Sequence, residues 1–339
     1  MEKNNIKREI NQTTWKGFSA VSFCAGGYEA LLIPGIGANL IELKYDMKGL
    51  SLLRTPDDGE IFKVKPQVYG IPVLFPPNRI EDGTFKAAGN VYNFPINEAA
   101  RNNHIHGFLH TRPWQVTKTE LIGDAAGIEL VFSADSSTDF YRYFPHEFEC
   151  RLLYRLSTGG LEQRISVQNK SGKAMPLGVG FHTAFRVPFH PGGKEENYRL
   201  KVSIGQKWEL DDRMLPTGKI LPLDNGEEAY RSQGVVPVGH VIDRQLYTAK
   251  KIKIDDKEFH GAVIEDATEG IRLVYEVDGE YKHWMLWNET GDKGFVCPEP
   301  QTWTVNAPNL KLPDEITGLM LLPAGETWQG SCRIFVQEI

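Results

Sequence analysis

The feature that most constrains the fold of this chain is a short alternation of apolar and polar residues that recurs along its length. The runs with this pattern include residues 40–46, 148–156, 161–167 and 271–277. Alternation with a period of two residues is typical of β-strands that bury one face and leave the other in water. No stretch has the pattern of an amphipathic helix of three or more turns.

Turn signals separate many of these runs. They are Gly-Gly at 26–27 and at 159–160, Asp57-Asp58-Gly59, Glu81-Asp82-Gly83 and Asp278-Gly279. Strand-like runs joined by such short turns form antiparallel hairpins. The sequence therefore predicts an all-β protein with enough antiparallel strands for two large packed sheets.

Length and composition predict the domain organisation. The chain has 339 residues, and large all-β folds of this size occur as single domains. Its 33 glycines and 20 prolines are spread evenly and not gathered in a linker, so we expect one domain over residues 1–339. We expect the Pro- and Gly-rich residues 187–194 to form a loop.

Charge and cysteine usage exclude several functions. The net charge is −6 and the pI is about 5.9, so no basic excess exists to bind nucleic acid or an anionic membrane. Four scattered cysteines without a CxxC pair argue against a disulfide framework and a structural zinc site. The N-terminus is polar and no run approaches ~18 apolar residues, so we expect no signal peptide, no transmembrane helix and a cytoplasmic location.

One carboxylate stands between two prolines, in Cys297-Pro298-Glu299-Pro300. Proline fixes its own φ and pushes the preceding residue to extended geometry, so Glu299 lies on a stiff, non-helical segment. A carboxylate held beside apolar groups can have a raised pKa, which suits a general base near neutral pH. The alternative is a solvated glutamate in a Pro-rich turn. Cys297 is interpreted as a buried thiol.

Arginine and histidine supply further candidates. Arg79 ends a stiff Pro-rich segment, and its guanidinium suits hydroxyl, carboxylate or phosphate recognition, although it could instead tie the acidic turn 81–83. His104 and His106 would share one face of a strand, which is a possible metal-binding spacing, but His110 is poorly placed as a third ligand. Gly107 permits close approach of a ligand or an unusual turn.

Two more segments carry a histidine and an aspartate. His182 lies between two aromatic residues, in a run that reads as a buried strand reaching a loop. Histidine exchanges protons near neutral pH, but a satisfied core histidine is the alternative interpretation. Asp243 follows two apolar residues and precedes Arg244, with which it could form a surface pair.

Taken together and in this order, these segments resemble the aldose 1-epimerase (galactose mutarotase-like) family. The resemblance spans roughly residues 30–335 and rests on residues 72–85, 105–108, 175–185, 215–218, 241–243, 297–309 and 322–326. It implies a β-supersandwich with a sugar-binding groove on one sheet. It also implies that Glu299 is the general base and His182 the general acid of anomer interconversion, without metal or cofactor. The residues implied to bind the sugar are Asn78, Arg79, His106 and Asp243.

The chain departs from the family pattern near His182. Phe181 stands where the family has asparagine, and Ala184 stands where it has tyrosine, which changes the groove and leaves the sugar open. Phe181, Phe185 and Trp303 could stack on a pyranose or pack in the core.

Three other functions stay open on the same fold. One is a non-catalytic sugar-binding protein. Another is a hexose-6-phosphate mutarotase in which Arg79 and Arg186 face the phosphate. The third is a lyase or hydrolase with Asp243 as a second carboxylate.

Overall fold

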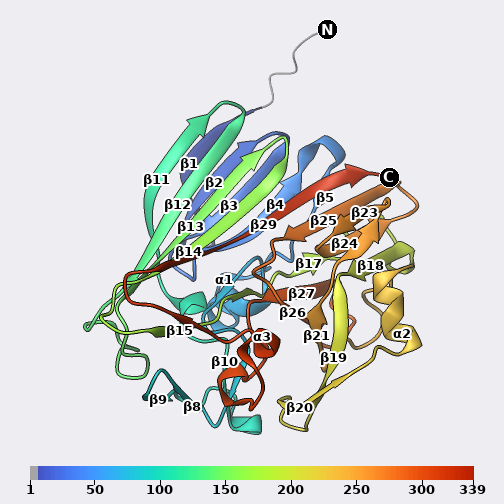
Figure 1. Cartoon of the computed structure of the whole chain (residues 1–339). Coiled ribbons are helices and arrows are strands. Elements are labelled where there is room, and N and C mark those ends of the chain that lie inside the picture. Colours follow the sequence, from blue (N-terminus) through green and yellow to red (C-terminus); the bar gives the residue numbers. More distant parts are fainter. Residues whose placement is uncertain (1–6) are drawn as a thin grey trace.

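The computed structural model describes residues 7–339, and strands dominate it (Figure 1). Within these residues the α-helices are α1 (Gly59–Val64), α2 (Asn225–Glu228) and α3 (Asp314–Thr317). The short 3-10 helices are Asp46–Lys48, Pro66–Val68, Ala99–Arg101, Leu109–Thr111, Glu195–Asn197, Ala229–Arg231 and Ala307–Asn309. None of the α-helices exceeds two turns, as the sequence predicts.

Three large sheets carry the fold. Sheet I consists, in order, of β1 (Glu9–Trp15), β2 (Phe18–Ala25), β3 (Tyr28–Ile33), β4 (Asn39–Tyr45) and β5 (Leu50–Ser51). Sheet II consists of β11 (Gln115–Ile122), β12 (Ala125–Ala134), β13 (Phe148–Ser157), β14 (Gly160–Asn169), β29 (Thr327–Glu338), β25 (Ile271–Val277), β24 (Gly261–Asp266) and β18 (Tyr198–Val202). Sheet III consists of β20 (Pro216–Leu221), β19 (Ile204–Leu210), β21 (Gln245–Ala249), β26 (His283–Trp287), β27 (Phe295–Gln301), β16 (Gly180–Phe181) and β6 (Val73–Leu74), with β17 (Phe185–Arg186) joined to β27.

Four two-stranded pairs complete the described strands. They are β7 (Arg79–Glu81) with β10 (Asn103–Ile105), β8 (Thr84–Ala87) with β9 (Asn90–Asn93), β15 (Met175–Leu177) with β28 (Met320–Leu322), and β22 (Ile252–Ile254) with β23 (Lys257–Phe259). The strand pairings of all seven sheets are antiparallel. The predicted all-β, antiparallel class is therefore confirmed.

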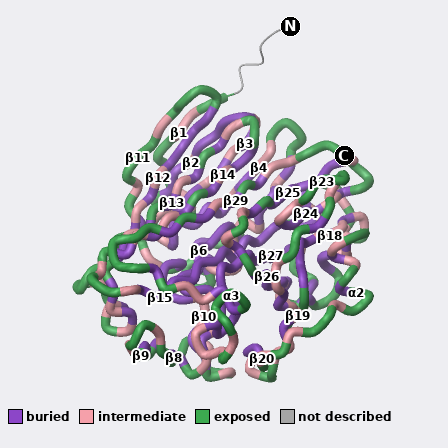
Figure 2. Tube along the Cα trace, viewed as in Figure 1, coloured by how far each residue is buried: buried purple, intermediate pink, exposed green. Residues whose placement is uncertain are grey.

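Sheet II packs against both other sheets. Its strands β12 and β13 contact β2 of sheet I, and Figure 1 shows these strands as layers at one end of the molecule. At the other end, Tyr275 of β25 packs against Phe185 and Trp284 of sheet III, with ring centroids 5.3 and 6.4 Å apart. One cluster of buried apolar side chains spans all three sheets, and Figure 2 shows the buried stretches of their strands in purple. Residues 1–339 as a single domain remain a prediction.

One face of sheet III packs against sheet II, so a site can lie only on the opposite face, which is called the outward face. Side chains alternate across a strand, so Trp284 on the sheet II side places His283, Met285 and Trp287 on the other face. The same alternation puts Phe181 and Thr183 toward sheet II, where Thr183 Oγ1 donates to Tyr275 Oη at 3.1 Å. The outward face of sheet III is the one that carries the candidate site.

The predicted runs agree with the structure, with one turn as the exception. The four alternating runs correspond to β4, β13, β14 and β25, and residues 187–194 contain no strand or helix. The turn predicted at 57–59 is wrong, because Asp58 caps a helix: its Oδ1 accepts from the backbone N–H groups of Glu60 and Ile61. No helix in residues 7–339 has the length and apolar character of a membrane span.

Candidate active site

A cavity of about 270 Å³ opens on the outward face of sheet III. The residues that line it are Gln67, Val68, Asn78, Arg79, Arg101, Ile105, His106, His182, Met214, Asp243, Met285, Trp287 and Glu299. All six site residues predicted from the sequence are among them. They come from separate segments between residues 78 and 299, which the fold brings to one place.

Glu299 lies in the middle of β27, opposite Met285 of β26. Its side chain is buried, and Oε2 has no hydrogen-bond partner within the described residues. Burial raises the pKa of this carboxyl group well above its ordinary value, while the nearby Arg79 guanidinium lowers it. Glu299 is buried on an extended strand, so the solvated-turn alternative is wrong. Cys297, two residues earlier, is a buried thiol as predicted.

His182 is set opposite Glu299 by the register of β16. Gly180 pairs with Gln301, and two further steps of this antiparallel register bring His182 to Glu299. The backbone N–H of His182 donates to Pro72 O at 3.2 Å, which anchors the residue beyond the end of the strand. Nε2 of His182 lies 3.2 Å from Oε1 of Glu299, and both side chains are nearly inaccessible to solvent.

Burial favours the uncharged form of both members of the pair. It lowers the pKa of His182 to about 3, so the free imidazole is neutral, and it raises the pKa of the Glu299 carboxyl well above its ordinary value. A neutral acid beside a neutral imidazole avoids placing two charges in a dry environment. Transfer of the carboxyl proton from Glu299 to His182 across the 3.2 Å contact would create a carboxylate and an imidazolium. The pair therefore contains one donor and one acceptor in either form.

His106 reaches the cavity through an unusual backbone. Strand β10 ends at Ile105, and both His106 and Gly107 have φ of 64°. Only glycine fits at 107, because a Cβ there would lie 1.9 Å from Phe75 O. The two-histidine strand face proposed from the sequence is therefore wrong at His106. Its ring packs edge-on to His182 at 5.3 Å between centroids, and its Nδ1 has no partner within the described residues.

His110 packs edge-on against His106, with ring centroids 6.3 Å apart, but the three histidines do not form a metal-binding group. His104 is buried against Phe94 and Phe108, and its Nδ1 lies 2.7 Å from Pro95 O. Residues 7–339 contain no group of three metal-ligating side chains. Within this motif, His104 lies in the aromatic core and His106 lines the cavity.

Arg79 enters the cavity wall as part of a charge cluster. Its Nε and Nη2 both donate to Glu98 at 2.8 Å, which fixes the plane of the guanidinium. Arg101 lies 3.1 Å from the same carboxylate, so two cations share one anion. Asn78 Oδ1 accepts from Arg79 Nη1 at 3.3 Å, and Asn78 itself has a φ of 56°. Sequence reasoning missed Glu98, since nothing links it locally to Arg79.

The acidic turn 81–83 is tied by Arg213 and not by Arg79. Arg213 contacts Glu81 at 3.3 Å and Asp82 at 2.7 Å, and it also donates to the backbone of Arg101 and Asn102. These bonds clamp the turn that carries Met214, whose φ is 64°, onto the segment that carries Arg79. Met214 thereby becomes part of the cavity wall, which no local sequence signal indicated.

Asp243 lies at the exposed rim of the cavity. The buried side chain of Asn288 holds the preceding loop: its Oδ1 accepts from Ile242 N at 2.7 Å and its Nδ2 donates to His240 O at 2.8 Å. Arg244 turns away and donates to Asp211 O at 2.5 Å. Asp243 is thus free to face a ligand, and the surface pair with Arg244 is not formed.

The apolar wall differs from the one considered from the sequence. Phe181, Phe185 and Trp303 are buried core residues and do not line the cavity. Trp303 packs so closely on the segment between β15 and β16 that a Cβ at Gly178 would lie 2.3 Å from its ring. The aromatic ring of the cavity is that of Trp287, which packs edge-on to His182 at 5.3 Å between centroids.

Comparison with known sequences places the chain in a family. The sequence model described as aldose 1-epimerase matches residues 19–334, and the chain belongs to the aldose 1-epimerase family. The uncharacterized protein YihR of Escherichia coli K12 is 30% identical over 199 residues, which cover 58% of this chain and 59% of YihR. The plasmid-borne LacX protein of Lactococcus lactis is 24% identical over 196 residues, or 58% of this chain and 62% of LacX. The matches thus span about three fifths of these relatives.

Comparison with solved structures agrees with this assignment. A galactose mutarotase-like protein from Clostridium acetobutylicum superposes with a TM-score of 0.95, is 44% identical and covers 98% of this chain and 99% of its own. A galactose 1-epimerase from Lactobacillus acidophilus superposes with a TM-score of 0.71 at 15% identity, covering 98% and 99%. The second likeness shows the fold alone. The comparisons thus establish the family and the fold.

Proposed function

We propose that this protein is an aldose 1-epimerase that interconverts the α and β anomers of a free hexose or related aldose. The observation that carries the proposal is the pairing of Glu299 and His182 in a sugar-sized cavity, with Nε2 and Oε1 3.2 Å apart. Mutarotation needs one proton acceptor and one proton donor for two oxygens bonded to the same carbon. A carboxylate–imidazole pair that shares one proton supplies both.

The reaction is balanced within the pair and the sugar. On entry of the sugar the shared proton moves to His182, which leaves Glu299 as a carboxylate. Glu299 takes the proton of the anomeric hydroxyl, the bond from C1 to the ring oxygen breaks, and His182 gives its proton to the ring oxygen. Rotation about C1–C2 and the reverse steps close the ring as the other anomer. The protein ends each cycle with the proton it began with.

The other cavity residues are assigned to binding. Arg79 is held in a fixed plane by Glu98, so its remaining nitrogen Nη1 can donate to a sugar oxygen together with the neighbouring Asn78. The neutral imidazole of His106 faces the reacting groups, and Asp243 accepts from hydroxyls at the rim. Trp287 and Met285 offer an apolar wall to the C–H face of a pyranose.

A free sugar fits the cavity better than a phosphorylated one. Arg79 and Arg101 share the carboxylate of Glu98, which offsets one of the two positive charges. Arg186, the other cation considered for a phosphate, lines a separate hollow with Arg54 and Lys293. The proposal is therefore an epimerase of uncharged aldoses.

The test is the rate of anomer exchange for freshly dissolved α-anomers, followed by polarimetry or NMR. A panel of neutral aldoses and hexose 6-phosphates is compared with buffer alone. We expect acceleration for at least one neutral aldose. Acceleration of phosphorylated sugars alone would reject the charge argument. Calorimetric binding of a sugar without any acceleration would favour the non-catalytic alternative, and neither binding nor acceleration would reject both.

A further inference from the structure

Gln301 is a buried residue that the proposed mechanism does not use. It is fully inaccessible to solvent, and neither its amide nitrogen nor its amide oxygen has a hydrogen-bond partner within residues 7–339. Buried amides in native proteins are almost always hydrogen-bonded, so an exception needs an explanation. The position of Gln301 in sheet III supplies one.

Gln301 lies two residues after Glu299 on the same strand, β27. Side chains two residues apart on a strand point to the same face, so the amide and the carboxylate lie side by side on the outward face of sheet III. The Oε2 atom of Glu299 also has no partner in the described part of the chain. Within the described chain, the amide nitrogen of Gln301 is therefore a free donor beside Glu299 Oε2, which is a free acceptor. The interaction with Gln301 lowers the pKa of Glu299, against the larger effect of burial.

Two neighbours fix where the Gln301 side chain can lie. Gly180 of β16 pairs with it, and a Cβ at Gly180 would lie 3.1 Å from Gln301 Cγ, so the absent side chain leaves room for the glutamine stem. On the opposite strand, His283 of β26 pairs directly with Gln301. His283 is also buried, and neither of its ring nitrogens has a partner in residues 7–339. Cross-strand neighbours of this kind are within reach of each other's side chains.

We propose that Gln301 is a positioning residue for Glu299, and that His283 orients the Gln301 amide; the proposal rests on the assignment of Glu299 as the base. When Glu299 becomes a carboxylate, the Gln301 amide nitrogen would donate to its Oε2, and a ring N–H of the neutral His283 would donate to the amide oxygen. Oε1 is thereby left for His182 and the sugar. A hydrogen bond to the charged form of a carboxyl group favours that form, so Gln301 helps Glu299 to release its proton.

Other groups near Glu299 also influence its titration, and the design of a test has to hold them constant. His182 faces it from the end of β16 at 3.2 Å, Arg79 acts from β7, and Cys297 acts from β27 itself. His106 and Asp243 line the same cavity, and His283 lies across the strand pair. A substitution at Gln301 leaves all of these side chains in place.

The chain contains a matched control for a substitution at this site. Gln163 of β14 is also buried, and both atoms of its amide likewise lack partners in the described residues. It lies in sheet II, paired with Tyr154 and Cys332, and does not line the cavity. Gln301→Leu and Gln163→Leu therefore remove the same amide from equally buried sites, and only the first site adjoins Glu299.

The first measurement follows the titration of the Glu299 carboxyl by NMR of protein carrying carbon-13-labelled glutamate, assigned with Glu299→Gln. We expect Gln301→Leu to raise the pKa of Glu299 by about one unit, the order of a lost hydrogen bond to a carboxylate. Gln163→Leu is expected to leave it unchanged. This readout does not depend on activity, so it tests the position of Gln301 even if no sugar is turned over. An unchanged pKa in Gln301→Leu, or an equal shift in both variants, would overturn the proposal.

The second measurement is the pH dependence of anomer exchange on an accepted sugar. We expect Gln301→Leu to lower kcat about tenfold with little change in KM, and to move the alkaline limb of the profile, where the pair loses its shared proton, to higher pH. Should Gln301→Leu fail to fold, Gln301→Glu keeps the shape and removes the amide donor, and the same upward shift is expected. A wild-type profile in a folded Gln301 variant would contradict the proposal, whereas an inactive wild-type protein would contradict only the proposed function.

Discussion

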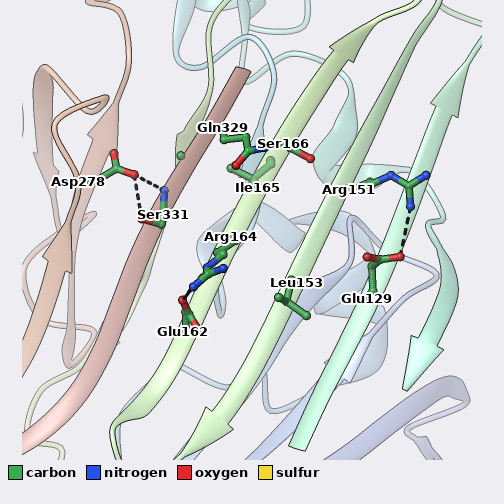
Figure 3. A pocket seen from close by; sticks show the side chains of 11 residues that line it. Glu129, Arg151, Leu153, Glu162, Arg164, Ile165, Ser166, Asp278, Gln329 and Ser331 are labelled. Carbon is green, nitrogen blue, oxygen red and sulfur yellow. Dashed lines mark hydrogen bonds and ion pairs between the residues drawn. The ribbon is translucent and has the colours of Figure 1, made fainter. Parts of the chain in front are cut away.

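Two hollows on the outer faces of this protein differ in whether their polar and charged side chains have hydrogen-bond or ion-pair partners. The groove on sheet II has a volume of about 410 Å³ and is larger than the cavity on sheet III, at about 270 Å³. Figure 3 shows the groove, in which Arg151 contacts Glu129, Arg164 contacts Glu162 and Ser331 donates to Asp278. None of the buried atoms that lack partners in residues 7–339 belongs to the groove.

The cavity on sheet III has the opposite character. His106, His182 and Glu299 each present a buried polar atom without a partner in the described chain. Burying a polar group without a hydrogen bond costs stability, so such groups persist where a ligand completes them. The comparison teaches that size alone does not identify the site: of these two hollows, the smaller one is lined by buried polar atoms without partners in the described residues. The groove is a solvated sheet face whose charges are already paired.

The largest expected difference between the two hollows is in their response to acid. Burial lowers the pKa of His182 to about 3 and of His110 to about 4, and it holds the pKa of His106 well below its ordinary value. The unfolded chain binds a proton at each of these residues near pH 6.5, and the folded chain does not. Stability therefore falls as the pH drops from about 6.5 toward 4, by about 1.4 kcal/mol per pH unit for each histidine.

Urea unfolding at pH 7 and pH 5 measures the net change. The histidines lose stability toward pH 5, and the raised pKa of Glu299 acts in the opposite direction and offsets part of that loss. Replacing His110 by asparagine removes one of the titrating groups, so its pH slope should be smaller by about 1.4 kcal/mol per unit. A pH slope in His110→Asn equal to that of the wild type would mean that His110 titrates normally in the folded protein.

The next effect concerns the base itself. We expect Glu299→Gln to lower kcat/KM for anomer exchange at least about a hundredfold, the usual size of a lost general base. Glu162→Gln makes the same chemical change in the groove, where the carboxylate is partly exposed and bound by Arg164. It should leave kcat/KM unchanged. Polarimetry on both variants measures these rates. Turnover near wild type in Glu299→Gln would mean that Glu299 is not the general base.

A smaller effect is expected at the charge cluster of the cavity wall. Glu98 binds Arg79 and Arg101, much as Glu149 near the groove binds Arg151 and Lys170. Glu98→Gln removes the charge that holds the Arg79 fork, so we expect KM to rise about tenfold, or about 1.4 kcal/mol of binding, with a smaller change in kcat. Steady-state kinetics of Glu149→Gln should match those of the wild type. Equal changes in both variants would show a general electrostatic effect in place of a local one.

The sequence could predict the strands and the pair of reacting groups. Alternation located β4, β13, β14 and β25, because a half-buried strand imposes a period of two on its own residues. The resemblance placed Glu299 and His182 together, since the order of several short motifs identifies a fold that no single motif could. The register of β16 on β27 then accounts for their contact.

The supporting residues could not be predicted, because their partners lie far away in the chain. Arg213 clamps Glu81 across 132 positions, and Asn288 holds the loop before Asp243 across 46. Glu98 and Gln301 likewise acquire their roles only from neighbours in the folded state. Local patterns such as Asp57-Asp58-Gly59 were also ambiguous, since the same residues that favour a turn can cap a helix.

The smallest effect is expected in the middle of the groove. Arg164 is 62% exposed in its side chain and pairs with the neighbouring Glu162 on its own strand. Such surface pairs contribute little, so Arg164→Ala should change the free energy of unfolding by less than about 0.5 kcal/mol and leave sugar binding and anomer exchange unchanged. Calorimetry and polarimetry on this variant give the sharpest check of the contrast between the hollows. A loss of sugar binding in Arg164→Ala would show that paired, solvated charges can also form a sugar site. The presence or absence of hydrogen-bond and ion-pair partners would then no longer distinguish the two hollows.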